Sequence, residues 1–226
     1  MAGPLAYHPG EGIPIDSPLT YAAVLEERGH EMFGDAPGND EIAASLAEPH
    51  PGVPLAVHRY EGGWIYCASL GEVEGRHGAQ RLHWNKRFDD MLAQRAIEAG
   101  GIELGRRSKV NLGAGEFRAY HMPLYLEHVE RLVWHAIGEP GEVLRLLQTH
   151  VTHLGKKRAA GHGAVAAWDV EPWSGPADRW LWREPGVPAR AIPLRMLGSW
   201  EGETAAAGAR PPYWLAAHQV LCAVGS

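Results

Sequence analysis

The chain has 226 residues, 45% of them hydrophobic and 21% charged, and its formal net charge is −6. This composition is typical of a soluble globular protein with one large domain or two small ones, and it argues against a generally basic nucleic-acid binder. The charge is unevenly distributed: residues 1–80 hold 3 cationic and 12 acidic side chains (net −9), and the other residues hold 18 and 15 (net +3). A bound nucleic acid is therefore expected to avoid the first third of the chain.

Two cysteines, Cys67 and Cys222, lie far apart in the sequence, and neither belongs to a CxxC or Cys/His zinc spacing. A reduced protein of the cytoplasm is the simplest expectation. The N-terminal residues lack a basic leader followed by an apolar run, and no later run approaches membrane-spanning length. We therefore expect neither secretion nor membrane insertion.

The first elements in chain order are a helix and a hairpin. Ser17 as the N-cap and Pro18 in the first turn predict a helix that ends at Gly29. The acidic residues 37–54, rich in Pro and Gly, predict a surface excursion with a short helix. Residues 57–69 then contain two β-prone runs around a glycine pair, which predicts a hairpin.

The middle of the chain combines a helix pattern with several strand patterns. Residues 71–80 have a loop-like composition, and residues 88–101 predict a helix that ends at a glycine pair. A strand-rich block follows, with β-prone runs at residues 106–112, 116–126 and 129–137. The last of these runs alternates well enough for a half-buried strand.

A further helix is predicted over residues 141–155, because its apolar residues form one stripe that consists of Val143, Leu144, Leu147, Val151 and Leu154. This helix leads into a glycine-rich segment. Residues 164–173 predict a strand that leaves the segment, and another strand is expected within residues 210–224.

This order of elements predicts an α+β fold in which helices pack on one side of a sheet. It is compatible with a ferredoxin-like βαββαβ unit that carries insertions. Such a unit begins with a strand before its first helix, and only residues 3–8 are available for that strand. We therefore expect a truncated first strand.

The glycine-rich segment 155–163 is the most informative part of the sequence. It sets three adjacent cations, Lys156, Lys157 and Arg158, among three glycines, and no acidic residue occurs between Glu142 and Asp169. Glycines bring backbone N–H groups close to a ligand, and Lys and Arg supply charge for phosphate oxygens. The pattern predicts a clamp for a phosphate backbone. The alternative is a glycine-rich connection whose cations are only solvated.

Two longer segments resemble the anchor regions of the RAMP superfamily of CRISPR proteins, namely IDSPLTYAAVLEERG and LLQTHVTHLGKKRAAGHGAVAAWDVE. In that superfamily a modified RNA-recognition fold carries a Gly-rich loop after its last helix. The chain is most similar to the type IV subunit that is related to the subunit capping the guide RNA 5′ handle. Three further pieces match, PLAVHRYEGGWIYCAS, KVNLGAGEFRAYHMPLY and RPPYW. The resemblance implies one RAMP-like domain over residues 1–226, with a core at 13–173 and a C-terminal extension at 174–226.

The resemblance also implies a function. The chain is expected to be a non-catalytic RNA-binding subunit of a type IV CRISPR effector complex, without a cofactor, in a hetero-oligomer with the backbone and large subunits. It would hold the 5′ handle of the guide RNA and contact the backbone subunit. The first expected RNA-binding set matches the family loop and consists of Gly155, Lys156, Lys157, Arg158, Gly161, His162 and Gly163. A second set mixes cations with an aromatic ring suited to a single RNA strand, and consists of Arg106, Arg107, Lys109, Arg118 and Tyr120.

Two rival functions remain open on the sequence. A metal-independent repeat endoribonuclease of the same superfamily needs a general acid and base, roles that His121, His135 or His162 could fill, although their spacing does not select them. His150 and His153 have the spacing of a metal-ligand pair without a suitable carboxylate or Cys nearby in sequence, so no metal site is expected. The second rival is a protein–protein adaptor without RNA contact.

Overall fold

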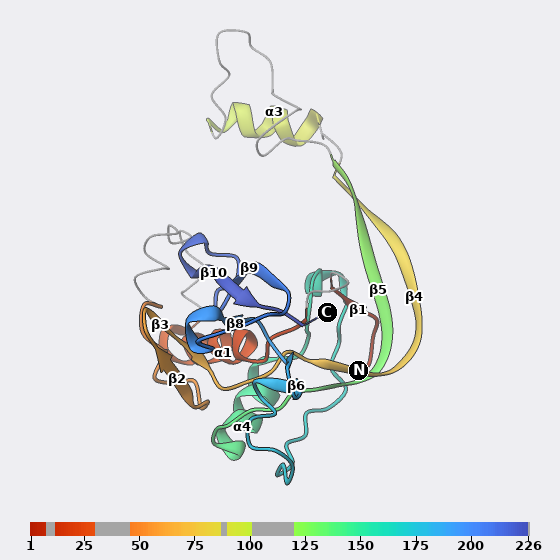
Figure 1. The fold of residues 1–226 in the computed structure, drawn as a ribbon. Helices are drawn as coiled ribbons and strands as arrows, with labels where there is room; N and C mark the ends of the chain where they lie inside the picture. The colour runs from red at the N-terminus through yellow and green to blue at the C-terminus, as the bar shows by residue number, and fades with distance from the viewer. Residues whose placement is uncertain (8–11, 30–45, 87–89, 101–119, 226) are drawn as a thin grey trace. The chain divides into compact units, whose positions relative to one another are not determined.

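A computed structural model describes residues 1–7, 12–29, 46–86, 90–100 and 120–225. The chain divides into two compact units, which are considered separately. The main unit comprises residues 1–78 and 127–226, and the ribbon unit comprises residues 79–126. Helices and small antiparallel sheets together give an α+β protein, which confirms the predicted class (Figure 1).

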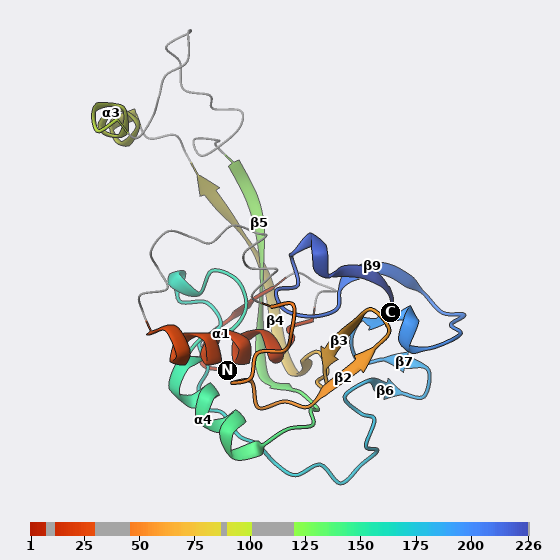
Figure 2. The ribbon, with the colours of Figure 1, turned by 90° about the vertical axis from the view of Figure 1, so that its left-hand side faces the viewer.

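Two helices of the main unit, α1 (Asp16–Arg28) and α4 (Pro140–His150), pack against each other (Figure 2). The hairpin β2 (Val57–Tyr60) and β3 (Gly63–Tyr66) has the predicted turn, with Tyr60 opposite Gly63. A second sheet has the order β8 (Ile192–Pro193), β10 (Gln219–Ala223) and β9 (Thr204–Gly208). Strands β6 (Trp182–Glu184) and β7 (Val187–Pro188) form a further antiparallel pair.

The remaining sheet has the strand order β1-β5-β4, and its two long strands run through both units. These strands are β4 (Glu72–Lys86) and β5 (Tyr120–Val133). The first strand β1 (Leu5–Ala6) has two residues and lies where the sequence predicted a shortened strand. The ribbon unit also contains α3 (Asp90–Glu98), which confirms the helix predicted before the glycine pair.

Strand β3 separates two hydrophobic cores. Trp64 and Tyr66 belong to the first core, with Leu19 of α1 and Leu146 and Leu147 of α4. The alternate residues Ile65 and Cys67 belong to a second core that also includes Trp180, Ala209 and Cys222. Successive side chains of a strand point to opposite faces, so β3 contributes to both cores at once. Residues after 174 therefore share a core with the hairpin.

A buried charged cluster joins the start of α1 to the C-terminal part of the chain. Arg190 donates to the backbone carbonyls of Tyr66, Ala68 and Ala209 and, at 3.1 Å, to the hydroxyl of Tyr213. That hydroxyl donates to the carboxylate of Asp16 at 2.7 Å. Burial raises the pKa of Asp16, and the Arg190 guanidinium and Tyr213 hydroxyl oppose the rise. Two motifs distant in sequence, IDSP and RPPYW, therefore meet in the interior.

Several strand predictions were wrong, for one common reason. Residues 72–80 belong to strand β4 instead of a loop, and the strands predicted over residues 116–126 and 129–137 correspond between residues 120 and 133 to the single strand β5. Polar residues that indicated breaks find partners across the two strands: Arg131 bonds Glu74, and His77 contacts Glu130 at 2.6 Å. Cross-strand pairing of this kind stabilises a sheet and outweighs the low strand propensity of the glycines.

Two local predictions at helix and loop ends also failed. The strand predicted over residues 164–173 is absent, and only Ala164 makes a ladder bridge, with His153. The indole of Trp168 instead donates to the carbonyl of Val151 at 2.8 Å, so this segment is held by a side chain. Helix α1 begins at Asp16, one residue before the predicted cap Ser17, and makes no side-chain cap hydrogen bond. It ends as predicted at Gly29, where φ is 64°.

Candidate nucleic-acid interface

Helix α4 delivers the chain into the glycine-rich segment, referred to below as the glycine loop (residues 155–163). Val151 and Leu154 follow the helix and are buried in the first core, which fixes the entry to the loop. Within the loop, positive φ angles occur at Gly155, Lys157, Gly161 and Gly163. Lys157 is the one non-glycine residue with a positive φ, 57°, in the described part of the chain, and this conformation costs about 1 kcal/mol. The sequence therefore turns back on itself and presents its cations at the bend.

Backbone hydrogen bonds hold both ends of the glycine loop against the N-terminal segment. The amide of Lys156 donates to the carbonyl of Ala6 in β1 at 2.7 Å, and the amide of Gly163 donates to Pro4 at 2.8 Å. A Cβ on Gly155 would lie 2.4 Å from the carbonyl oxygen of Ala6, and one on Gly163 would lie 1.9 Å from that of Leu154. These glycines are thus required by close backbone approach as well as by their φ angles.

The same hydrogen bonds limit one part of the sequence-based mechanism. The amides of Lys156, Gly161 and Gly163 donate to backbone carbonyls, the second of them to Arg158 at 2.9 Å. An amide that is already bonded to a carbonyl does not serve a phosphate oxygen at the same time. These three loop amides are engaged within the protein, so phosphate binding by the loop is expected to depend mainly on its side chains.

The cations of the glycine loop are largely exposed. Lys156 and Arg158 are exposed, and Lys157 and His162 are half-buried. The guanidinium of Arg158 lies 5.9 Å from the ring centroid of Tyr21 on α1, at the limit of a cation–π contact. Between Glu142 and Asp169 the sequence has no acidic residue, so the local charge of the loop is +3.

Of the second predicted set, the structure describes only Tyr120. Its hydroxyl accepts a hydrogen bond from the Trp84 indole at 3.2 Å in the ribbon unit. The cations Arg106, Arg107, Lys109 and Arg118 lie outside the described residues. Whether they surround Tyr120 stays a prediction.

The described part of the ribbon unit carries a second group of rings that sequence reasoning missed. His83 and His121 stack with ring centroids 4.1 Å apart and planes 11° apart, and Arg81 lies over the ring of Tyr125 at 5.6 Å. Partial desolvation lowers the pKa of His83, and the nearby His121 and Arg81 lower it further. The alternation of Arg81 and His83 along a strand was the available signal, but no strand had been predicted between the loop at residues 71–80 and the helix at residues 88–101.

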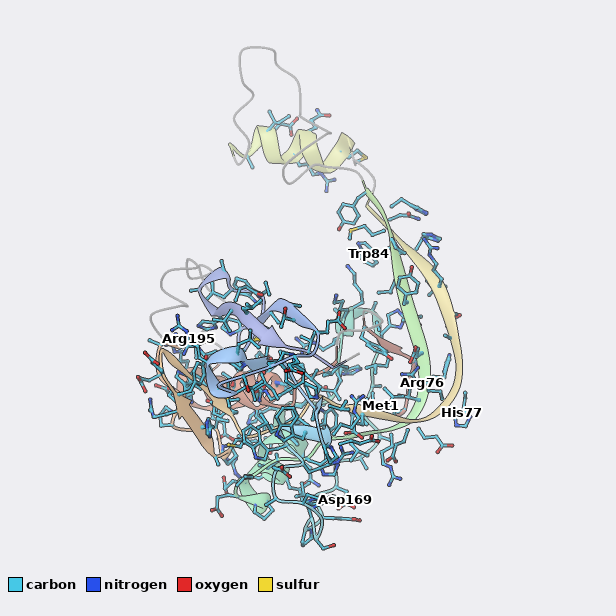
Figure 3. The ribbon with its side chains drawn as sticks, viewed as in Figure 1. Met1, Arg76, His77, Trp84, Asp169 and Arg195 are labelled. Carbon is cyan, nitrogen blue, oxygen red and sulfur yellow. The ribbon has the colours of Figure 1, made fainter. Side chains whose placement is uncertain are left out.

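In the main unit, the same two strands carry acidic residues that are paired. Tyr7 donates to Glu127 at 2.6 Å, and Arg76 lies 3.7 Å from the same carboxylate. Burial and this carboxylate raise the pKa of Tyr7 to about 12. His77 follows Arg76 on β4, where both are labelled in Figure 3, and pairs with Glu130.

Three of the histidines considered for catalysis or metal binding contact neighbouring side chains. His150 contacts Glu26 of α1 at 2.9 Å, and His153 contacts the hydroxyl of Thr152 at 3.0 Å. His135 packs edge-on against Trp173, and burial followed by the charge of Arg179 lowers its pKa. The described residues contain no cluster of three or more His, Cys, Asp or Glu side chains that could hold a metal ion. Among the helices that the structure describes, none is long and apolar enough to cross a membrane.

The glycine loop thus carries three adjacent cations, follows helix α4 and bonds to strand β1. The family model of the CRISPR type IV associated protein Csf3 matches residues 1–224. The chain belongs to this family. The match covers nearly the whole chain and confirms the predicted relationship to a type IV CRISPR subunit. No curated protein matches the chain.

Proposed function

We propose that the chain is a non-catalytic RNA-binding subunit of a type IV CRISPR ribonucleoprotein, which holds the 5′ handle of the guide RNA with the glycine loop. Family membership supports a place in a type IV system. The observation that carries the proposal is the run of Lys156, Lys157 and Arg158 on a loop that backbone hydrogen bonds fix to β1. Fixed cations bind phosphates with little ordering cost.

In the proposed mechanism the side chains of the loop do the binding, because several loop amides bond to β1 and to the loop itself. Lys and Arg contacts to phosphates position the RNA without reading its sequence. His162, half-buried between two glycines, supplies a further donor or a stacking face at the same bend. Tyr120 and the cations of the second set would hold bases of the same strand.

The proposal includes a fold relationship. In the RAMP resemblance, a Gly-rich loop follows the last helix of a modified RNA-recognition fold. Here the glycine loop follows α4 and bonds to β1, which is also paired with β5. We infer that the chain is a RAMP-type, ferredoxin-like protein in which β1 is the shortened first strand.

Hetero-oligomer formation with the backbone and large subunits in the cytoplasm is part of the same proposal. Exposed large apolar side chains of the main unit support protein partners: Trp214 is 63% exposed, Leu221 56% and Trp173 54%. Aromatic residues are enriched in the buried centres of protein interfaces.

The test is a salt titration of binding between the purified chain and a 5′-handle RNA. Replacing Lys156, Lys157 and Arg158 by Ala is expected to weaken binding and to flatten the slope of log Kobs against log salt by about 2, since each lost phosphate contact on a single strand contributes about 0.7. The charge-matched control replaces Arg59, Arg131 and Arg145, which are paired with Glu48, Glu74 and Glu26. An unchanged slope in the loop variant would favour the adaptor without RNA contact.

Catalysis is tested separately, by incubating the chain with CRISPR repeat RNA in EDTA. The proposal predicts intact RNA. A discrete cleavage product that is absent with the His162→Ala variant would contradict the proposal. The chain would then be a metal-independent endoribonuclease.

A further inference from the structure

Two side chains lie directly on the glycine pair at the turn of the β2–β3 hairpin. A Cβ on Gly62 would lie 2.6 Å from Nη1 of Arg195, and one on Gly63 would lie 2.7 Å from the hydroxyl oxygen of Tyr60. Arg195, labelled in Figure 3, comes from the short helical turn that follows β8. Because glycine has no side chain, the pair leaves room for a guanidinium and a hydroxyl beside one turn.

Arg210 brings a second guanidinium to the hairpin. Its guanidinium carbon lies 5.0 Å from the ring centroid of Trp64, the residue that follows the glycine pair. Arg210 is half-buried, and desolvation lowers its pKa, although Tyr60 and Glu48 oppose the shift. The carboxylate of Glu48 itself bonds to Arg59 at 2.7 Å. Arg210 is thus a partly desolvated cation that packs on an aromatic ring instead of a carboxylate.

Both arginines act on the hydroxyl of Tyr60. Burial raises the pKa of Tyr60, and the charges of Arg210 and Arg195 oppose that rise. Two guanidiniums and one hydroxyl therefore lie close together, and all three can donate hydrogen bonds. Among the described residues, no carboxylate forms an ion pair with Arg195 or Arg210. Burying part of a cation without a counterion is unfavourable, so the group is suited to an anion from outside the chain.

We propose that Tyr60, Arg195 and Arg210 form an anion-binding site, the hairpin site, which takes a phosphate group. Guanidiniums bind phosphate oxygens through charge-assisted hydrogen bonds, and the hydroxyl supplies a further donor. A tetrahedral phosphate accepts from donors on several sides, whereas a planar carboxylate is satisfied by one bidentate guanidinium. The three donors therefore favour phosphate over a carboxylate side chain. The hairpin site is separate from the glycine loop and does not rest on the proposed function.

The experiment measures the affinity of the full chain for two phosphate probes, a fluorescently labelled oligouridylate and sodium pyrophosphate. Arg195→Gln and Arg210→Gln are each expected to weaken binding of one or both probes about tenfold, because a charge-assisted hydrogen bond is lost. Tyr60→Phe removes only the hydroxyl and should cause a smaller loss. Arg195 is exposed, so its variant separates lost binding from lost stability.

The same measurements are repeated in the background that has Ala in place of Lys156, Lys157 and Arg158. The loss caused by the hairpin variants should persist there, which makes the result independent of the glycine loop. A loss for oligouridylate alone supports the hairpin site and identifies a nucleic-acid strand as the source of the phosphate. A loss for pyrophosphate alone supports it and identifies a small phosphorylated compound.

Arg131→Gln is the charge-matched control, because Arg131 is an exposed arginine of the main unit that pairs with Glu74. Its affinity for both probes should equal that of the parent. The proposal is overturned if Arg195→Gln leaves both affinities unchanged, or if Arg131→Gln causes the same loss. It is also overturned if the hairpin variants weaken binding of an oligoglutamate peptide only, since the site would then recognise an acidic protein.

Discussion

Two charged regions of the main unit illustrate opposite uses of arginine and lysine. In the cluster of Asp16, Arg190 and Tyr213 the two charged side chains are buried, and hydrogen bonds link both of them to the Tyr213 hydroxyl. In the glycine loop the backbone is equally well bonded, but cationic side chains are exposed and no acidic residue lies nearby in sequence. The buried charges of the first region contribute to the stability of the fold, whereas the second region places three adjacent cations on a backbone that hydrogen bonds hold in place.

The largest effect is expected on the buried side of this comparison. Arg190→Ala removes the partner of Asp16 and the donor to three backbone carbonyls, and should lower the free energy of unfolding by about 3–5 kcal/mol. Arg59→Ala, which breaks an exposed pair with Glu48, should cost less than about 1 kcal/mol. Urea denaturation measures both. Equal losses of unfolding free energy in the two variants would mean that the buried cluster stabilises the fold no more than an exposed ion pair does.

The backbone of the glycine loop is tested by two alanine substitutions at similar φ angles. Gly163→Ala places a Cβ against the carbonyl of Leu154 and should destabilise the chain by about 3 kcal/mol, because strain and overlap add. Gly161→Ala has no atom within 4 Å of its Cβ and should cost only about 1 kcal/mol. Thermal and urea unfolding distinguish them. If the two variants are equally stable, the close approach of the loop to Leu154 is not important for folding.

Alkaline pH should lower the free energy of unfolding, because the buried thiol of Cys222 would have to ionise. Burial raises the pKa of Cys222 from about 9 to about 11, so the folded state favours the neutral thiol. The contribution of the neutral Cys222 thiol to the free energy of unfolding is therefore fully present below pH 9. It is lost as the pH rises from 9 through 11, which lowers the free energy of unfolding by about 2–3 kcal/mol. Unfolding free energies at pH 8.5 and pH 11 measure the loss, which should be smaller in Cys222→Ala. A variant with the same pH dependence as the parent would contradict the assignment.

The smallest change in stability is expected at Lys157, where the two regions differ most clearly. Lys157→Gly removes the strain of the left-handed conformation, but it also raises the conformational entropy of the unfolded chain. The two effects oppose each other, so the free energy of unfolding should stay within about 1 kcal/mol of the parent value. The RNA salt slope should nevertheless fall by about 0.7. A variant with normal stability and normal slope would remove Lys157 from the RNA-binding set.

The sequence predicted what depends on neighbouring residues. Periodicity and glycines located α1, α4 and the β2–β3 hairpin, and the spacing of Lys156 to Gly163 located the glycine loop. Interactions between distant residues were not predictable. The amide hydrogen bonds from the loop to Ala6 and Pro4, the pairing that makes residues 72–80 a strand, and the contact between Asp16 and Tyr213 all depend on tertiary structure. The histidine pair was missed for the same reason, because it exists only in the register of β4 and β5.

The central claim is that the glycine loop contacts the 5′ handle of the guide RNA, and photo-crosslinking in the assembled type IV particle tests it most directly. Mass spectrometry of the crosslinked peptides is expected to find handle nucleotides attached to residues 155–163. Uncrosslinked loop peptides, together with chemical protection of Lys156 and Lys157 by a neighbouring subunit in particles without RNA, would contradict the claim and place a protein interface at the loop.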